Sequence, residues 1–144
     1  MKPKILIVAA NYYEKITNTL SLHTSSVLDK KAKYKFILVP GVFEIPVVIS
    51  KNIKKYDGFI ALGCVIKGET PHFDFISSAT TNAIMNLSID HKKPIGNGII
   101  TCLNLEQGIA RSSKKGQEAA NAVLSILGLG KWAKKMLFKI LGLL

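Results

Sequence analysis

The chain has 144 residues, a length typical of one domain, and its 48% apolar content excludes an intrinsically disordered polypeptide. A net charge of +11 suggests nucleic-acid binding as one possible function. Four of the lysines lie in the last fourteen residues, however, and the net charge of +7 on the rest of the chain accompanies no RNP-like, zinc-ligand or helix-turn-helix motif. No apolar run approaches the ~18 residues that cross a bilayer, and no signal-peptide cleavage site follows the N-terminus, so we expect a cytoplasmic protein whose partners are anionic small molecules rather than nucleic acid.

Four strand-like runs alternate with helical patterns along the chain. Strands are predicted at residues 4–10, 34–39, 57–66 and 94–102. Helical spacing of apolar residues follows over residues 16–27, 45–53, 73–87, 104–111 and 116–127, and the fourth of these helices begins at a capping box of Asn104 and Gln107. Strands rich in Ile, Val and Leu, each followed by a helix, indicate a parallel sheet covered on both faces. We therefore predict an α/β protein with a flavodoxin-like, three-layer αβα fold around a four-stranded parallel sheet.

Residues 68–75, GETPHFDF, combine the features of a catalytic phosphate site. Thr70 and Pro71 are predicted as the N-cap and the first residue of a helix that begins at the carboxyl end of a buried strand. Such a helix start offers free backbone N–H groups and the positive end of a dipole to a phosphate. His72 is expected beside that phosphate, where an imidazole with an ordinary pKa near ~6.5 both takes and gives a proton at neutral pH.

Ligands of open parallel sheets bind beyond the carboxyl ends of the strands. In this chain the rule selects residues 10–12, 40–44, 64–72 and 101–111. The two cysteines, Cys64 and Cys102, fall inside the third and fourth predicted strands without metal-ligand spacing. We expect them to be buried thiols in a reducing compartment, and we expect no metal site.

Three segments resemble the signature motifs of lumazine synthases: VPGVFEIP (39–46), ALGCVIKGETPHFDF (61–75) and NLEQGIARS (104–112). The resemblance extends in order from Ile5 to about Leu127. It implies a cofactor-free condensation of 5-amino-6-(D-ribitylamino)uracil with 3,4-dihydroxy-2-butanone 4-phosphate, in which phosphate and water leave. It also implies homo-oligomers, as pentamers, decamers or hollow shells, with active sites between neighbouring subunits.

The resemblance assigns roles to individual residues of this chain. Tyr12 matches an aromatic residue that stacks on the pyrimidine, and His72 matches the general acid and base. The other positions that match the pyrimidine and ribityl site are Val42, Phe43, Glu44, Cys64, Val65, Ile66 and Asn97. The positions that match the phosphate site are Glu69, Thr70, Arg111 and Lys115, with Arg111 reaching the phosphate from the neighbouring subunit.

Some of these residues depart from the family pattern or have a plainer structural explanation. The family usually has phenylalanine or tryptophan where this chain has Tyr12, and often phenylalanine where it has Asn97. The chain between Arg111 and Lys115 is a few residues shorter than usual, which affects how both residues reach the phosphate. Without the resemblance, Tyr12 is an ordinary half-buried tyrosine, Phe43 is a core residue and Lys115 is a solvated lysine.

Residues 131–144, KWAKKMLFKILGLL, form a basic tail beyond a single domain of residues 1–130. The tail's apolar residues recur at helical intervals, and Lys131, Lys135 and Lys139 are spaced by four on another side. A cationic amphipathic helix is able to lie on an anionic membrane. We favour instead a stripe that packs on its own subunit or on a neighbour, or an end that is not native-like.

Two other functions agree with parts of the sequence. A non-catalytic flavodoxin-like module for FMN or a nucleotide predicts a yellow protein on purification, but it leaves Glu44, residues 70–72 and Arg111 without a shared role. A basic interaction protein for nucleic acid or membrane predicts binding that weakens steeply with salt. Neither accounts for three motifs in one order, so we predict the lumazine synthase reaction.

Overall fold

A computed structural model describes residues 1–129 and 131–142, and for residues 131–134 it describes the backbone alone. The strands are β1 (Lys4–Ala10), β2 (Lys33–Val39), β3 (Gly58–Ile66) and β4 (Ile95–Cys102). The helices are α1 (Glu14–Leu28), the 3-10 helix η1 (Val42–Glu44), α2 (Ile45–Asn52), α3 (His72–His91), α4 (Leu105–Ile126) and α5 (Lys131–Ile140). The predicted strands are confirmed to within one residue at each end.

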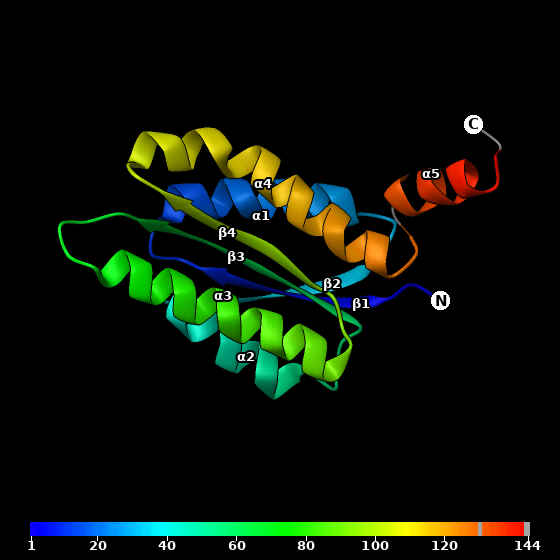
Figure 1. Cartoon of the computed structure of the whole chain (residues 1–144), viewed down its shortest axis with the longest axis horizontal. Coiled ribbons are helices and arrows are strands. Elements are labelled where there is room, and N and C mark those ends of the chain that lie inside the picture. The colour runs from blue at the N-terminus through cyan, green and yellow to red at the C-terminus, as the bar shows by residue number, and fades with distance from the viewer. Residues whose placement is uncertain (130, 143–144) are drawn as a thin grey trace.

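All four strands are parallel, in the order β2-β1-β3-β4, and helices cover both faces of the sheet. Helices α1 and α4 lie on one face and α2 and α3 on the other (Figure 1). This arrangement confirms the predicted flavodoxin-like, three-layer α/β fold. The order of the strands reverses between β1 and β3, and such a reversal leaves a crevice at the carboxyl ends of the strands.

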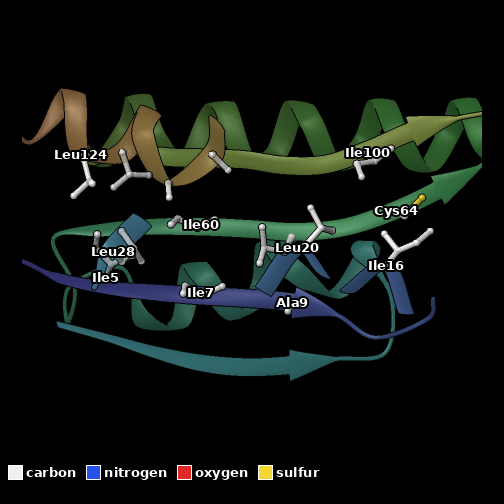
Figure 2. Packing of buried hydrophobic residues seen from close by; sticks show 14 of the residues in the cluster. Ile5, Ile7, Ala9, Ile16, Leu20, Leu28, Ile60, Cys64, Ile100 and Leu124 are labelled. Carbon is white, nitrogen blue, oxygen red and sulfur yellow. The ribbon is translucent and has the colours of Figure 1, made fainter. Parts of the chain in front are cut away.

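The apolar side chains of the strands form one core on each face of the sheet. On one face, alternate residues of β1, β3 and β4 pack against Ile16, Leu20 and Leu28 of α1 and against Leu124 of α4 (Figure 2). On the other face, the intervening strand residues pack against Ile45 and Ile49 of α2 and residues of α3. The central strands β1 and β3 are buried on both sides, which explains their continuous apolar sequence.

Helix α4 corrects one sequence prediction, because residues 104–111 and 116–127 belong to a single helix of 22 residues. The prediction left residues 112–115 outside both helices and placed Gly116, a residue that costs about 1 kcal/mol in a helix interior, at the start of the second one. Here Gly116 is buried, and a Cβ at this position would lie 2.6 Å from the carbonyl oxygen of Leu20. The Thr24 hydroxyl donates to the Gly116 carbonyl at 3.2 Å. Gly116 therefore allows close contact between α1 and α4 and does not end the helix.

The start of α3 also differs from the prediction. The helix begins at His72, with Pro71 in the N-cap position and no side-chain cap hydrogen bond, so Thr70 lies just outside the helix. Pro71 has no N–H, and its carbonyl accepts from the backbone N–H groups of Asp74 and Phe75. The predicted capping box at α4 is present in modified form: the Asn104 side chain accepts from the Gln107 N–H, and the Gln107 side chain accepts from the Leu103 N–H.

The basic tail forms helix α5, which follows α4 and contacts it. Met136, Leu137, Ile140 and Leu141 are 49%, 54%, 76% and 59% exposed, so the expected packing of this stripe on its own subunit is not found for the described side chains. The predicted tail residues Trp132 and Leu144 lie outside the described side chains. Within the described residues, no helix is long and apolar enough to span a membrane.

Candidate active site

A cavity of about 540 Å³ lies at the carboxyl ends of the strands, where the strand order reverses between β1 and β3. This size is typical of small-molecule sites. The cavity receives residues from the segments that follow β1 and β2, from the end of β3 and from the start of α3. Its lining residues are Tyr12, Tyr13, Gly41, Val42, Phe43, Glu44, Cys64, Val65, Ile66, Gly68, Thr70, His72, Phe73 and Ile76.

Two tyrosines follow β1 and form one wall of the cavity. The Asn11 N–H donates to the Val39 carbonyl at 2.8 Å, and the Thr17 hydroxyl donates to the Ala10 carbonyl, so the turn out of β1 is fixed to both β2 and α1. The rings of Tyr12 and Tyr13 meet edge to face, with centroids 4.9 Å apart. Tyr12 is 76% exposed, so its ring is open to a stacking ligand.

The segment Val42–Glu44 forms a second wall as the 3-10 helix η1. The Val42 side chain is buried directly over Gly63 of β3, where a Cβ would approach Val42 Cγ1 to 2.6 Å. Phe43 is 63% exposed, which is incompatible with the plain explanation of a core residue. Glu44 occupies the N-cap of α2 without a side-chain cap hydrogen bond, so its carboxylate is open to a ligand's hydroxyl groups.

The end of β3 offers its backbone to the cavity. Pairing of β3 with β1 stops at Leu62, opposite Ala9, whereas pairing with β4 continues to Ile66. The edge of Cys64–Ile66 that faces away from β4 therefore has no neighbouring strand. Free backbone N–H and C=O groups in this position suit the alternating donors and acceptors of a flat heterocycle.

The turn between β3 and α3 brings Thr70 and His72 to the same cavity. His72 is the first residue of α3, whose N-terminus presents unpaired backbone N–H groups. The dipole of this 20-residue helix favours an anion at that end. The arrangement places the His72 imidazole at the start of this helix, in the wall of the cavity.

Two cysteines lie in the core at this end of the sheet. Cys64 and Cys102 are buried and free, and their Sγ atoms are 3.7 Å apart. Burial, with a further contribution from the neighbouring thiol, raises the pKa of Cys64 to about 12. Cys64 is therefore a neutral thiol near pH 7. Both cysteines are buried and free, as expected. In the part of the chain that the structure describes, no three His, Cys, Asp or Glu side chains gather as metal ligands.

Four predicted site residues do not line this cavity: Glu69, Asn97, Arg111 and Lys115. Asn97 lies on the outer strand β4, where its side chain accepts from the Ile99 N–H at 3.1 Å. Arg111 donates to the Thr101 carbonyl at 3.4 Å and is exposed on the β4 side of the molecule. Because α4 is continuous, Arg111 and Lys115 lie one turn apart on the same side of the helix.

The cavity also contains residues that the sequence did not single out. Tyr13, Phe73 and Ile76 line it, together with Gly41 and Gly68. Burial, followed by the neighbouring Tyr12, raises the pKa of Tyr13 above its ordinary value, so its hydroxyl stays protonated at neutral pH. Adjacency to Tyr12 was the available signal for Tyr13, and helical spacing from His72 was the signal for Ile76.

Comparison with known proteins places most of this chain in one family. The family model described as 6,7-dimethyl-8-ribityllumazine synthase matches residues 2–131. A protein of that name from Bartonella tribocorum is 44% identical over 138 residues, covering 90% of this chain and 91% of the relative. Relatives of the same name from Agrobacterium fabrum and Campylobacter jejuni are 42% and 38% identical, covering 90% and 89% of this chain and 96% and 90% of each relative.

Proposed function

Because this chain belongs to the 6,7-dimethyl-8-ribityllumazine synthase family, which acts in riboflavin biosynthesis, we propose that its cavity condenses 5-amino-6-(D-ribitylamino)uracil with 3,4-dihydroxy-2-butanone 4-phosphate. The observation that carries the proposal is the union of three elements in one cavity. They are the free backbone edge of Cys64–Ile66, the exposed ring of Tyr12, and the His72 imidazole at a helix N-terminus.

The pyrimidine substrate binds between the aromatic wall and the end of β3. Its ring stacks on Tyr12, which needs only the flat face that a tyrosine shares with phenylalanine. The uracil edge pairs with backbone groups of Cys64–Ile66, so the side chains at these positions matter less than the strand's position. The Glu44 carboxylate accepts hydrogen bonds from the ribityl hydroxyls, with Val42 and Phe43 beside it.

The phosphate ester binds at the start of α3. Backbone N–H groups of the Glu69–Thr70 turn, the Thr70 hydroxyl and the helix dipole stabilise the phosphate dianion. The 5-amino group attacks the ketone carbonyl, and loss of water gives an imine. His72 transfers protons during imine formation and during elimination of the phosphate. Loss of phosphate leaves an enol at the neighbouring hydroxyl-bearing carbon, and this enol tautomerises to a ketone. Attack of the ribitylamino nitrogen on the new carbonyl closes the second ring with loss of water, and no cofactor takes part.

A neighbouring subunit completes this site. Large apolar side chains are exposed on both outer edges of the sheet, with Phe36 and Leu38 of β2 being 40% and 62% exposed and Leu103 and Leu105 beside β4 being 61% and 50% exposed. Two different apolar surfaces on opposite edges suit head-to-tail contact, which closes into rings such as a pentamer.

In such a ring, Arg111 and Lys115 of one subunit bind the phosphate held by the next subunit. A guanidinium fork matches two phosphate oxygens, and Lys115 adds a positive charge one turn away. Asn97, which is exposed on the same edge, contacts the pyrimidine of that neighbour. The two buried free thiols support a reducing compartment, so we place the reaction in the cytoplasm.

Two experiments test the proposal. Purified protein is mixed with the two substrates, and the absorbance and fluorescence of the lumazine product are followed. A lack of product, or a protein that is purified with bound flavin, would favour the binding-module alternative.

The shared site is tested by mixing two defective variants, His72→Ala and Arg111→Ala, under conditions that exchange subunits. Random mixing in equal amounts restores about one quarter of intact sites if each site takes His72 from one subunit and Arg111 from the next. Activity no higher than the mean of the separate variants contradicts the shared site while leaving the reaction itself established by the first experiment.

A further inference from the structure

Lysines gather at the end of the sheet that is opposite the candidate active site. The three loops that lead into β2, β3 and β4 carry the pairs Lys30–Lys31, Lys54–Lys55 and Lys92–Lys93. All six lie in solvent except Lys93, which is partly buried. Lys4, Lys33 and Lys35 add to this end and border a shallow concavity with Lys55. We call this surface the basic end.

Few carboxylates offset the charge of the basic end. Asp29, Asp57 and Asp90 are the acidic residues beside these loops. Asp29 accepts a hydrogen bond from the Tyr34 hydroxyl at 2.7 Å, and Asp57 accepts one from the Lys4 backbone N–H at 2.8 Å. Neither bond neutralises the ammonium group of a lysine. The basic end therefore has a strong positive potential.

Helix α5 lies at this same end. Figure 1 shows it beyond the end of α4, on the side of the N-terminus and away from the loop between β3 and α3. The segment 131–144 contains four lysines and no acidic residue. Successive residues of a helix are 100° apart, so Met136, Leu137, Ile140 and Leu141 share one side, and Lys135 and Lys139 share another.

The apolar side of α5 is exposed rather than packed. Ile140, at the middle of that side, is 76% exposed, and Leu141 and Leu137 are 59% and 54% exposed. A second copy that docked through the same surface would bring its own basic end against the first, which like-charge repulsion opposes. A nucleic acid would neutralise the lysines but would leave the apolar side in water. An anionic bilayer surface satisfies both, because lysines bind headgroups and the apolar side enters the acyl boundary.

We propose that α5 and the basic end dock this protein on the surface of an anionic lipid bilayer. Helix α5 lies in the plane of the interface, with Met136, Leu137, Ile140 and Leu141 facing the acyl chains. The lysine pairs of the basic end rest on the headgroups. The active-site cavity opens at the other end of the sheet, so docking leaves it accessible to small molecules.

The experiment is co-sedimentation of the full chain with phosphatidylcholine vesicles that contain either no anionic lipid or about 30 mol% phosphatidylserine. We expect strong partition onto the anionic vesicles and weak partition onto the neutral ones. Trp132 is the chain's single tryptophan, so a blue shift of its emission on the anionic vesicles supports insertion of the tail.

Matched variants separate the two contributions. Lys135→Gln with Lys139→Gln should lower partition by about 30-fold, and Leu137→Ser with Ile140→Ser by at least about tenfold. The control, Lys15→Gln with Lys114→Gln, removes the same charge from exposed positions remote from α5 and should change partition by no more than about twofold, because charges beyond a Debye length are screened. All the altered side chains are exposed, so unchanged circular dichroism spectra are expected from every variant.

Three outcomes overturn the proposal. The first is no partition onto anionic vesicles. The second is partition that survives the Leu137→Ser and Ile140→Ser changes, which reduces the effect to general charge attraction. The third is binding of a duplex DNA probe that is tighter than vesicle binding and does not change in the Leu137→Ser and Ile140→Ser variant. That result would assign the basic end to nucleic acid instead.

Discussion

Gly63 links the packing of the sheet to the shape of the active site, so Gly63→Ala is an informative change. Gly63 lies on β3 under the 3-10 helix η1. An added Cβ would approach Val42 Cγ1 to 2.6 Å and Ala10 Cβ to 3.0 Å. Valine is stiff at χ1 and alanine has no rotamer to change, so the backbone of η1 or β1 must move.

The expected magnitude follows from two opposing effects. Overpacking of a filled core costs about 1–3 kcal/mol. Replacing glycine restricts the unfolded chain and returns about 0.4–1 kcal/mol. The net expectation is a loss of about 1–2 kcal/mol, or a melting temperature lower by roughly 3–8 °C for a chain of this size. Since η1 carries Val42, Phe43 and Glu44, its displacement should also lower kcat/KM by roughly 10- to 100-fold.

Gly68→Ala is the matched control for stability. Gly68 borders the same cavity, but a Cβ there meets no atom within 4 Å, and its backbone is outside the left-handed region. This variant should be as stable as the parent or more stable by about 0.4–1 kcal/mol. Denaturant unfolding at fixed protein concentration and steady-state lumazine formation measure the two effects. A Gly63→Ala protein with parental stability and parental kcat/KM would refute the proposed contact between β3 and η1.

Three further predictions concern proton transfer, the thiols and the start of α4. His72→Ala should lower kcat by roughly 10²-fold with little change in KM, whereas His23→Ala should leave both unchanged; an unaltered kcat removes His72 from its role. The pKa of Cys64 is raised to about 12 from an ordinary 9.0, so this thiol should resist iodoacetamide at pH 8.5 until the chain unfolds, and rapid alkylation of the native protein would contradict this. The stability that Cys64 contributes should also fall as pH rises from 9 towards 12, because only the unfolded chain loses the proton in that range. Asn104→Ala removes the 2.9 Å hydrogen bond from the Gln107 N–H and should cost about 1 kcal/mol, measured by thermal unfolding, and a loss below about 0.3 kcal/mol contradicts the cap.

Local patterns were sufficient to predict the sheet and most helices. The strands of this protein are continuous apolar runs between turn residues, and burial of β1 and β3 on both faces is the physical reason for that pattern. The error at α4 has an equally physical origin. Helix propensity disfavours Gly116 in a helix interior, whereas contact with Leu20, ninety-six positions earlier in the chain, makes glycine the residue that fits. Such long-range contact is not visible in a local window.

The site was predictable to the extent that it depends on strand ends. The rule for parallel sheets selected the segments that contain Tyr12, Glu44, Thr70 and His72, and all four line the cavity. The sequence does not reveal that β1 pairing ends at Leu62, which frees the backbone of Cys64–Ile66. Nor does it show that α3 starts one residue later than its Thr-Pro pair indicates, because the missing N–H of Pro71 fits the N-cap as well as the next position.

The strand order explains why the predicted site residues Asn97 and Arg111 do not line the cavity. The cavity forms where β1 and β3 separate. Asn97 lies on β4, the outer strand on the other side of β3, and Arg111 of α4 donates to the Thr101 carbonyl of that strand. A side chain on an outer strand is more easily presented to a second molecule than to a cavity behind the neighbouring strand. In the proposed shared site, a phosphate at the start of α3 is stabilised by the helix N-terminus of one subunit, and Arg111 of its neighbour adds a positive charge.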